Sequence, residues 1–399
     1  MSIAKPHALI IGAGSTGLLI SQGLKQSGIS STVFEKSTEN DYKDRPRHWS
    51  MALHWGANFL HKCLPKDILA DIRSIEADPF IKMTAEQEKS FPFVNGKTGE
   101  VIVQVPGEST RRVSRAKLRK LFSQGLDVRY GKRLKNVEED GVQVIAYFED
   151  GTSASGDILV GCDGAKSTVR ARLLTLEENR LDPIPLFNAN FAVTYTAEQA
   201  LFIRNAYHPS FFMAPHPEQQ TSFLIAMADV EDPTKPDTWV FLINFAIWGV
   251  EQPAGNTDRL KLVKKYAANY CEPFKSAAKW IPDNTWVPPD VFKVWTHPVK
   301  WNNHGGRITL AGDAAHPLPP FRGQGLNIAL EDAYHYIQAI ESYAKGKGTL
   351  EEAVSQYDAD VLERGKREAE MSNLQTYGTH HWEVLMDSPL VNKTGISKT

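Results

Sequence analysis

The spacing of apolar residues predicts alternating strands and helices at the start of the chain. His7 to Ile11 is a largely apolar run of strand length, and residues after Gly17 recur at helical spacing to about Ser27. A second apolar run, from Ser31 to Phe34, follows a glycine stop. Strand, helix and strand in this order predict the βαβ arrangement of a parallel sheet.

The same change of period returns near the end of the chain. Ile308 to Ala311 is a short apolar run typical of a strand, and from about Leu326 the apolar residues recur at helical spacing. Three prolines in the intervening stretch exclude a helix there. We therefore expect a strand that delivers Asp313, a rigid loop, and a helix whose first backbone N–H groups face the same gap.

The middle of the chain has a different texture, with frequent prolines and short β-type runs rich in aromatic residues. We expect a largely antiparallel sheet, with the runs Phe223–Met227 and Val240–Phe245 in its core. A helix near Asp258–Tyr270 is expected to cover that sheet.

Shorter elements complete the pattern. Ser114 to Gln124 is typical of a helix capped by Ser114, and Ile158 to Val160 is typical of a buried strand. An amphipathic helix begins at Leu350 and extends to about Leu362, and the last ten or so residues are expected to form a loose tail. The domains expected from these patterns are residues 1–182 (with a candidate strand pair of the second sheet within 75–110), residues 183–300, and residues 301–399 with C-terminal helices.

Composition narrows the function classes. The 399 residues are 42% hydrophobic and 23% charged, with a formal net charge of −2, so neither nucleic acid nor an acidic membrane is an expected partner. The three cysteines, Cys63, Cys162 and Cys271, are widely separated, and we expect neither a disulfide framework nor a metal site. Without a signal-peptide core or an apolar run of about 20 residues, the expected location is cytoplasmic.

The first turn carries the spacing Gly12-x-Gly14-x-x-Gly17, and Glu35 ends the second strand 18 residues later. In a dinucleotide-binding turn, one glycine makes the bend, one lets the backbone approach a pyrophosphate, and one lets the helix lie close to the sheet. A carboxylate at the position of Glu35 accepts hydrogen bonds from the ribose hydroxyls. The adjacent Lys36 is a further candidate for binding the cofactor. The alternative is a glycine-rich turn that serves only tight packing.

Two further stretches hold candidate residues. Arg45 to Trp55 contains two arginines, two histidines and two tryptophans. One interpretation is an exposed basic turn leading into a helix, and the other places arginines near phosphates and aromatic residues beside a flat ring. Asp163-Gly164 follows the buried strand, at the sheet edge where ligands of α/β proteins bind, although it is also typical of a plain turn.

Three motifs, Gly12-x-Gly14-x-x-Gly17, Asp163-Gly164-x-x-Ser167-x-Val-Arg170 and Gly312-Asp313-Ala-Ala-His316-Pro317, occur in this order. Together they resemble the single-component FAD monooxygenases typified by para-hydroxybenzoate hydroxylase and salicylate hydroxylase, over about residues 7 to 345. The fold class implied is α/β, with a Rossmann-like FAD-binding domain, an inserted and mainly antiparallel substrate domain, and C-terminal helices.

The resemblance also implies roles for individual residues. It places Glu35 at the adenosine ribose, Arg115 and Arg47 near the cofactor, and Asp313 at the ribityl or pyrophosphate region. Asp163 is a further candidate for the cofactor site. It implies that the helix after the proline loop presents the backbone of three residues to the flavin ring: Gly325, Leu326 and Asn327.

The activity implied is hydroxylation of an aromatic or related small natural product. FAD is expected to be bound non-covalently and reduced by NAD(P)H, and O2 is expected to react with the reduced flavin to give a hydroperoxide. We expect Pro320 and Phe321 to line the substrate pocket, and His54 or Tyr195 to handle a substrate proton. The bulky Phe321-Arg322 sequence departs from the pattern of the family.

Other functions share parts of this pattern. An epoxidase or a reductase of the same fold would use the same FAD motifs. A non-catalytic binding protein of the GDP-dissociation-inhibitor type resembles the first domain, but the intact Glu35, Asp163-Gly164 and Gly312-Asp313 argue against it.

Overall fold

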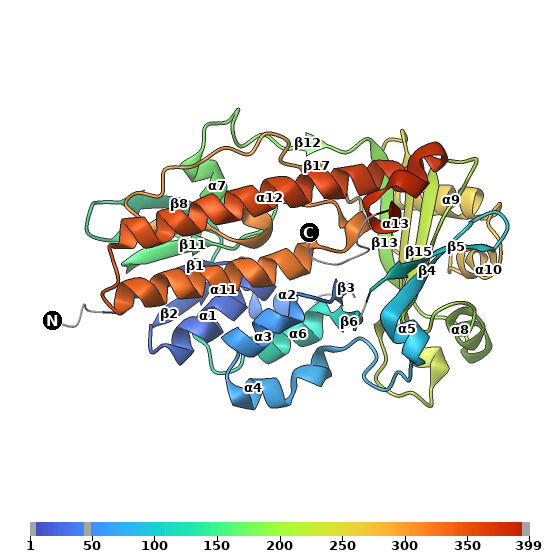
Figure 1. Cartoon of the computed structure of the whole chain (residues 1–399), viewed down its shortest axis with the longest axis horizontal. Coiled ribbons are helices and arrows are strands. Elements are labelled where there is room, and N and C mark those ends of the chain that lie inside the picture. Colours follow the sequence, from blue (N-terminus) through green and yellow to red (C-terminus); the bar gives the residue numbers. More distant parts are fainter. Residues whose placement is uncertain (1–4, 44–48, 108, 393–399) are drawn as a thin grey trace.

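A computed structural model describes residues 5–43, 49–107 and 109–392. Its first lobe is built on a five-stranded parallel sheet in the order β18-β11-β1-β2-β7 (Figure 1). All four residues of the central strand β1 are buried, as a run of consecutive apolar residues requires when both faces of a sheet are covered. The strands are β1 (Ala8–Ile11), β2 (Ser31–Phe34), β7 (Val128–Arg129), β11 (Ile158–Gly161) and β18 (Ile308–Leu310).

Two helices that begin at the sheet's ligand-binding edge pack against each other. They are α1 (Ser15–Gln26) and α11 (Gly325–Ala344), and a Cβ atom on Gly23 of α1 would overlap the Ile337 side chain of α11. The observed end of α1 and the observed start of α11 lie within one residue of the expected ones, whereas α1 begins before Gly17, earlier than expected. An antiparallel sheet of three strands lies beside them: β8 (Leu134–Glu139), β9 (Val144–Phe148) and β10 (Ser153–Gly156).

The second lobe is a six-stranded sheet in the order β13-β16-β15-β14-β4-β5, in which only β14 and β4 run parallel. Its strands are β13 (Leu186–Val193), β16 (Val240–Trp248), β15 (Thr221–Asp229), β14 (Phe211–Pro215), β4 (Ser90–Val94) and β5 (Val101–Pro106). The pair β4–β5 lies within residues 75–110. We therefore propose that residues 183–300 and this pair form one domain, inserted into a second formed by the rest of 1–182 and 301–399.

Side chains alternate between the two faces of this sheet, as the two-residue period of a strand requires. One face carries Phe241, Ile243 and Phe245 of β16 and packs into a core beneath three helices. The other face carries Leu242 and Asn244 of the same strand and looks toward the first lobe. The covering helices are α8 (Ala197–Arg204), α9 (Asn256–Ala267) and α10 (Phe274–Lys279).

One long helix, α12 (Leu350–His380), runs past both sheets (Figure 1). It begins with a capping box in which Thr349 and Glu352 satisfy each other's backbone N–H groups. The helix is 31 residues long and continues 18 residues beyond the expected end at Leu362. The sequence pattern predicted an earlier end because it assigns charged residues such as Arg364 and Glu368 to solvent. In the structure both side chains are buried and paired with opposite charges.

The segment after Trp49 forms a strand before the helix that one interpretation of this stretch gave. Ser50–Leu53 is strand β3, and it pairs antiparallel with β6 (Arg111–Ser114). Helix α6 (Arg115–Phe122) follows directly, with the Ser114 side chain accepting a hydrogen bond from the Lys117 backbone N–H group. Pairing with a distant strand, which local periodicity does not encode, decides the conformation here.

The remaining elements are short. They are α2 (Glu39–Lys43), α3 (Ala57–Cys63), α4 (Lys66–Ala70), η1 (Ile72–Ile75), α5 (Ala85–Lys89), α7 (Thr168–Leu173), β12 (Asp182–Pro183), η2 (Pro236–Thr238), β17 (Lys293–Val294), η3 (Gly312–Ala314), η4 (Pro320–Arg322), η5 (Trp382–Asp387) and α13 (Pro389–Asn392).

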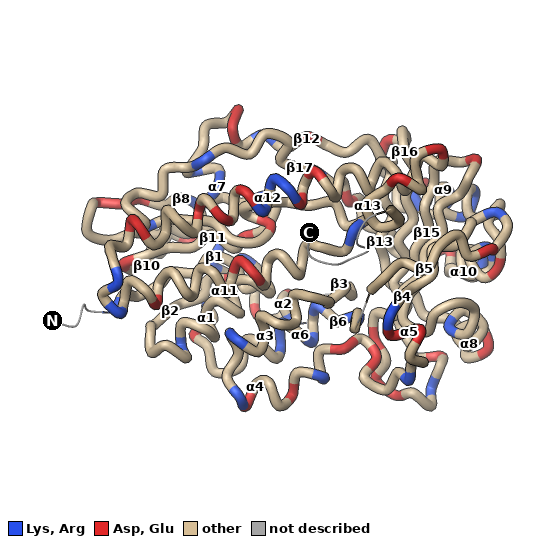
Figure 2. Tube along the Cα trace, viewed as in Figure 1, with Lys and Arg blue, Asp and Glu red and all other residues tan. Residues whose placement is uncertain are grey.

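Acidic and basic positions are interspersed along both lobes (Figure 2). Within the described residues, no helix combines the length and the apolar character needed to cross a bilayer. Nor do the described ranges bring together three or more side chains suited to hold a metal ion. The architecture is the α/β fold expected from the sequence.

Candidate functional site

A cavity of about 520 Å³ lies between the two lobes. Its walls come from the turn before α1, strands β3 and β6, the loop from η3 to the start of α11, and the inward face of the six-stranded sheet. This volume is in the range of small-molecule sites. Segments far apart in the sequence therefore meet at a single site.

The three glycines of the first turn have three different functions. Gly12 has φ near 111°, and a Cβ atom on it would overlap the carbonyl oxygen of Cys162. A Cβ atom on Gly17 would overlap the Gly12 carbonyl oxygen, whereas Gly14 borders open space in the cavity. No side chain caps α1, so its first N–H groups remain available to an anionic group, which the helix dipole also favours.

Glu35 is held at the end of β2 by two backbone groups. One carboxylate oxygen accepts a hydrogen bond from Ala13 N (3.1 Å) and the other accepts one from Ser37 N (3.0 Å). These bonds fix the buried carboxylate beside the glycine turn, with acceptor capacity left for ribose hydroxyls. Lys36, the adjacent candidate, is exposed.

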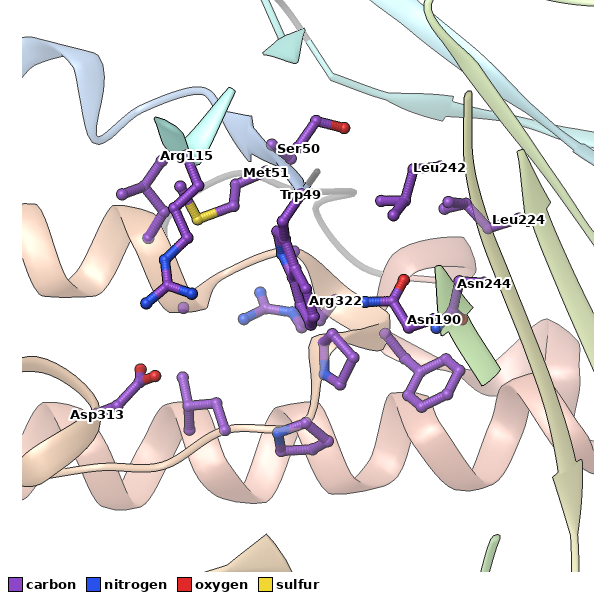
Figure 3. A pocket seen from close by; sticks show the side chains of 18 of the residues that line it. Trp49, Ser50, Met51, Arg115, Asn190, Leu224, Leu242, Asn244, Asp313 and Arg322 are labelled. Carbon is purple, nitrogen blue, oxygen red and sulfur yellow. The ribbon is translucent and has the colours of Figure 1, made fainter. Parts of the chain in front are cut away.

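Arg115 and Asp313 point toward each other across one end of the cavity (Figure 3). Asp313 is exposed to the cavity, and the enclosing protein raises the pKa of its carboxyl group, although the charges of His316 and Arg115 oppose that shift. A cation and a carboxylate on opposite walls suit a ligand that carries both phosphates and hydroxyls. Arg47, which the resemblance also placed near the cofactor, lies outside the described residues.

Asp163 has a different environment from Asp313. Its carboxylate accepts hydrogen bonds from the Ser167 hydroxyl (2.5 Å) and from Thr168 N (2.6 Å), so it caps helix α7. Burial raises its pKa, and these hydrogen bonds lower it in part. The next residue, Gly164, borders the cavity with open space beside it. Asp163 therefore supports the cavity wall from behind.

The start of α11 forms another wall. Gly325 and Leu326 border the cavity, and no side chain caps the helix. The buried Asn327 side chain accepts hydrogen bonds from His54 N and Gly56 N and donates to Ala52 O. Asn327 does not border the cavity, and its side chain fixes the start of α11 against the segment that contains β3.

A buried ionic network lies behind this wall. Asp332 accepts hydrogen bonds from His316 (2.5 Å), Arg364 (2.7 Å) and the Gly312 backbone (2.8 Å). Burial opposes ionisation of Asp332, but the charges of His316 and Arg364 outweigh it and lower its pKa to about 2. The network fixes the loop that carries Asp313.

The two residues expected to handle a substrate proton do not border the cavity. The Tyr195 hydroxyl donates to Ala277 O (3.1 Å) inside the core beneath the far face of the second sheet. His54 contacts Gly323 O and Asn327, and burial lowers its pKa to about 4. Both side chains are buried away from the cavity, so we assign neither a catalytic role.

The end of the cavity near the second sheet combines a turn, an indole and a strand face. Pro320 and Phe321 border this end of the cavity, and the Phe321 ring also packs against Phe292 and His380. Trp49 projects into the middle of the cavity (Figure 3). Asn190 and Asn244 were not among the candidates predicted from the sequence. The alternation of apolar and polar residues along β13 and β16 was the pattern that could have identified them.

These features fit a dinucleotide cofactor that carries a flat ring. The uncapped start of α1 suits the pyrophosphate, Glu35 suits the ribose, and open space at Gly14, Gly164 and Gly325 admits the ligand against bare backbone. The start of α11 offers N–H donors to an electron-rich ring. The fold and site thus define a flavin-dependent oxidoreductase.

Comparison with known proteins specifies the family. The FAD binding domain family matches residues 79–254 and 282–372. The chain is 36% identical over 398 residues to the FAD-dependent monooxygenase phnB of Penicillium herquei, covering 98% of this chain and 96% of that protein. It is 34% identical over 388 residues to the FAD-dependent monooxygenase cctM of Talaromyces islandicus, covering 96% and 95%. The chain therefore belongs to the single-component FAD-dependent monooxygenases.

Solved structures share the fold. Klebsiella pneumoniae HpxO, complexed with FAD and uric acid, aligns with a TM-score of 0.75 at 22% identity, covering 98% of this chain and 93% of that one. The 2,6-dihydroxypyridine-3-hydroxylase of Arthrobacter nicotinovorans aligns with a TM-score of 0.73 at 16% identity, covering 95% and 94%. The expected family and fold class are thus confirmed.

Proposed function

We propose that this monooxygenase uses NAD(P)H and O2 to hydroxylate an aromatic small molecule, with FAD bound non-covalently. The observation that carries the proposal is the continuity of the cavity, which extends from the start of α1 to the inward face of the second sheet. A cofactor gripped at the first end would bring its ring to the second, where an aromatic compound fits between Pro320 and the sheet. FAD, when bound, would supply the redox chemistry for which NAD(P)H is the reductant and O2 the source of the oxygen atom.

The residues of the chain contribute binding, orientation and exclusion of water. The turn before α1 and Arg115 would hold the phosphates, and Glu35 and Asp313 would accept hydroxyl groups. The backbone at Gly325 and Leu326 would face the ring. These groups are fixed by secondary structure and by the buried network around Asp332, so little reorganisation is needed during the reaction.

Non-covalent attachment is favoured by the chemistry of the lining. The one cysteine among the described cavity residues is Cys162, and burial raises the pKa of its thiol well above the usual range. A neutral thiol is a weak nucleophile. Apolar residues line the cavity and would limit the access of water, and these include Met51, Leu224, Leu242 and Pro319.

The test is to purify the protein, record its flavin spectrum, and measure NAD(P)H oxidation with a panel of electron-rich aromatic compounds. We expect yellow protein, release of FAD into the supernatant after acid precipitation, and substrate-stimulated NAD(P)H oxidation with a product that gains one oxygen atom. An epoxidised alkene product, or reduction without oxygen incorporation, would favour the epoxidase or reductase alternative. Flavin that stays on the precipitated protein would refute non-covalent binding.

A further inference from the structure

Three asparagines lie on the inward face of the second sheet. Asn188 and Asn190 are alternate residues of β13, and Asn244 is the partner of Asn190 in the neighbouring strand β16. Asn190 and Asn244 both border the cavity. Figure 3 shows both residues together with Leu224 and Leu242 at the sheet side of the cavity, with the Asn190 amide directed toward Trp49. The sheet thus offers carboxamides in an otherwise largely apolar region.

Their hydrogen bonding leaves capacity for a ligand. Asn244 and Asn188 share one hydrogen bond of 2.9 Å, so one polar atom of the Asn244 amide is in use and the other is not. Asn190 is only 3% exposed, and within the described part of the chain its amide has no hydrogen-bond partner. Asn190 therefore presents one unused donor group and one unused acceptor to the cavity.

With the cavity empty, only water can pair with the Asn190 amide, and a ligand that displaces this water must replace its hydrogen bonds. Leucine at this position would fit the apolar neighbours Leu224 and Leu242 without that requirement. A role in packing therefore does not explain Asn190, whereas recognition of a polar ligand does, since the bound ligand replaces the lost water.

The charge of the cavity indicates what kind of ligand this is. The charged lining residues come from other elements: Arg112 and Arg115 from β6 and α6, and Asp290, Asp313 and Arg322 from connecting segments. Arg322 is paired with Glu368, so that pair carries no net charge. Toward the substrate the sheet itself offers two carboxamides and the Ser222 hydroxyl, which bonds to His380, and no charged side chain. Neutral oxygen substituents match the carboxamides, whereas a carboxylate would pair with Arg112, whose guanidinium group is already bonded to Ser50.

We propose that Asn190 and Asn244 determine substrate specificity by binding an uncharged phenolic ring with two oxygen substituents, one that donates a hydrogen bond and one that accepts, as in a hydroxyaryl ketone. This inference rests on the proposed function and names the substrate class. Because both amides are fixed on a sheet, they hold the ring in one orientation and so select which ring carbon receives oxygen.

The test measures ligand binding to the FAD-loaded enzyme from the change in flavin absorbance. The probes are 2,4-dihydroxyacetophenone, its dimethyl ether and 2,4-dihydroxybenzoate. Wild-type enzyme is expected to bind the dihydroxyketone at least about ten-fold more tightly than either of the others, the effect of one or two hydrogen bonds in a dry site. Asn190→Leu should weaken binding of the dihydroxyketone about ten-fold and leave binding of the ether nearly unchanged.

The matched control is Asn58→Leu, which changes an exposed asparagine of α3 and should bind all three probes as wild type does. Asn190→Leu should also retain FAD and be at least as resistant to unfolding as wild type, which a structural asparagine would not allow. Should Asn190→Leu fail to fold, that result contradicts the argument, and Asn190→Ala then tests ligand binding separately.

Three results would overturn the proposal. The first is equal loss of affinity for the dihydroxyketone and the ether in Asn190→Leu, and the second is wild-type preference for the benzoate. The third is failure of the wild type to bind any of the three probes. These outcomes differ from failure of the proposed function, in which no aromatic compound stimulates NAD(P)H oxidation although FAD is bound.

Discussion

Replacing Glu368 with glutamine should destabilise the fold by breaking a buried ion pair. Glu368 of α12 and Arg322 of η4 form the pair, and their side chains are 4% and 1% exposed. Within the described residues, two further guanidinium nitrogens of Arg322, Nε and Nη2, have no hydrogen-bond partner. The Arg322 charge therefore depends strongly on this carboxylate, and Glu368→Gln would leave it uncompensated in the interior.

Removing one member of a buried pair costs about 3–5 kcal/mol. Glutamine keeps the shape and one acceptor, so we expect about 3 kcal/mol, measured as the free energy of unfolding of the FAD-free protein in urea. The double variant Arg322→Met with Glu368→Leu should recover most of that loss, because it removes both charges. The exposed pair Lys97–Glu218 is the control, and Glu218→Gln should leave the free energy of unfolding nearly unchanged.

A loss below about 1 kcal/mol for Glu368→Gln would refute the reasoning, since Arg322 would then be compensated by something other than this carboxylate. A double variant no more stable than the single one would refute it as well, because the defect would then lie in packing of the turn and not in the charge.

Four further predictions concern the cofactor site, the pocket and pH. Glu35→Ala should weaken FAD binding by about 1–3 kcal/mol in a fluorescence titration, the cost of leaving ribose hydroxyls unpaired. Asp313→Ala should lose more FAD and turnover than Asp163→Ala, whose main defect should be stability, and equal FAD content and turnover in both would contradict this ranking. Phe321→Leu should retain FAD but raise KM and the amount of hydrogen peroxide formed per NAD(P)H oxidised. If the share of NAD(P)H that leads to product stays unchanged, the substrate does not bind at this turn. Leucine is chosen because this largely buried ring packs against other residues. Burial lowers the pKa of His380 to about 4, so between pH 6.5 and 4 the unfolded state binds a proton that the folded state does not. The free energy of unfolding should therefore be full above pH 6.5 and should fall by about 1.4 kcal/mol per pH unit from pH 6.5 to 4. In urea unfolding, His380→Gln should show a weaker dependence of this free energy on pH in that range.

The sequence predicts the cofactor end of the site because each part of it is local. Gly12, Gly14 and Gly17 sit in one turn, and backbone conformation within a few residues explains all three. Glu35 and Asp313 each follow a strand by one to three residues, so the period of the strand places them at the same sheet edge. Such features need no knowledge of distant contacts.

The substrate end could not be predicted in the same way, because distant segments decide it. Ser50 to Leu53 becomes a strand only because β6, which is distant in the sequence, pairs with it. Alternation along β13 and β16 predicts a polar face at Asn190 and Asn244, but it does not show that this face borders the cavity. Tyr195 lies beyond the end of β13, and only the folded structure shows that it belongs to the core on the far side of the sheet.

Helix α12 explains how two lobes that share few local contacts can hold one cavity. Toward the first lobe, Arg364 bonds to Asp332, and toward the turn below the cavity Glu368 bonds to Arg322. Farther along, the His380 ring bonds to the Ser222 hydroxyl of the second sheet. Charged and polar groups make all three contacts, and such contacts tolerate only a narrow geometry, whereas apolar packing is not directional. Protonation of His380 or the loss of one charge in an ion pair would disrupt these contacts. The geometry of the cavity and the stability of the fold therefore depend on the same side chains.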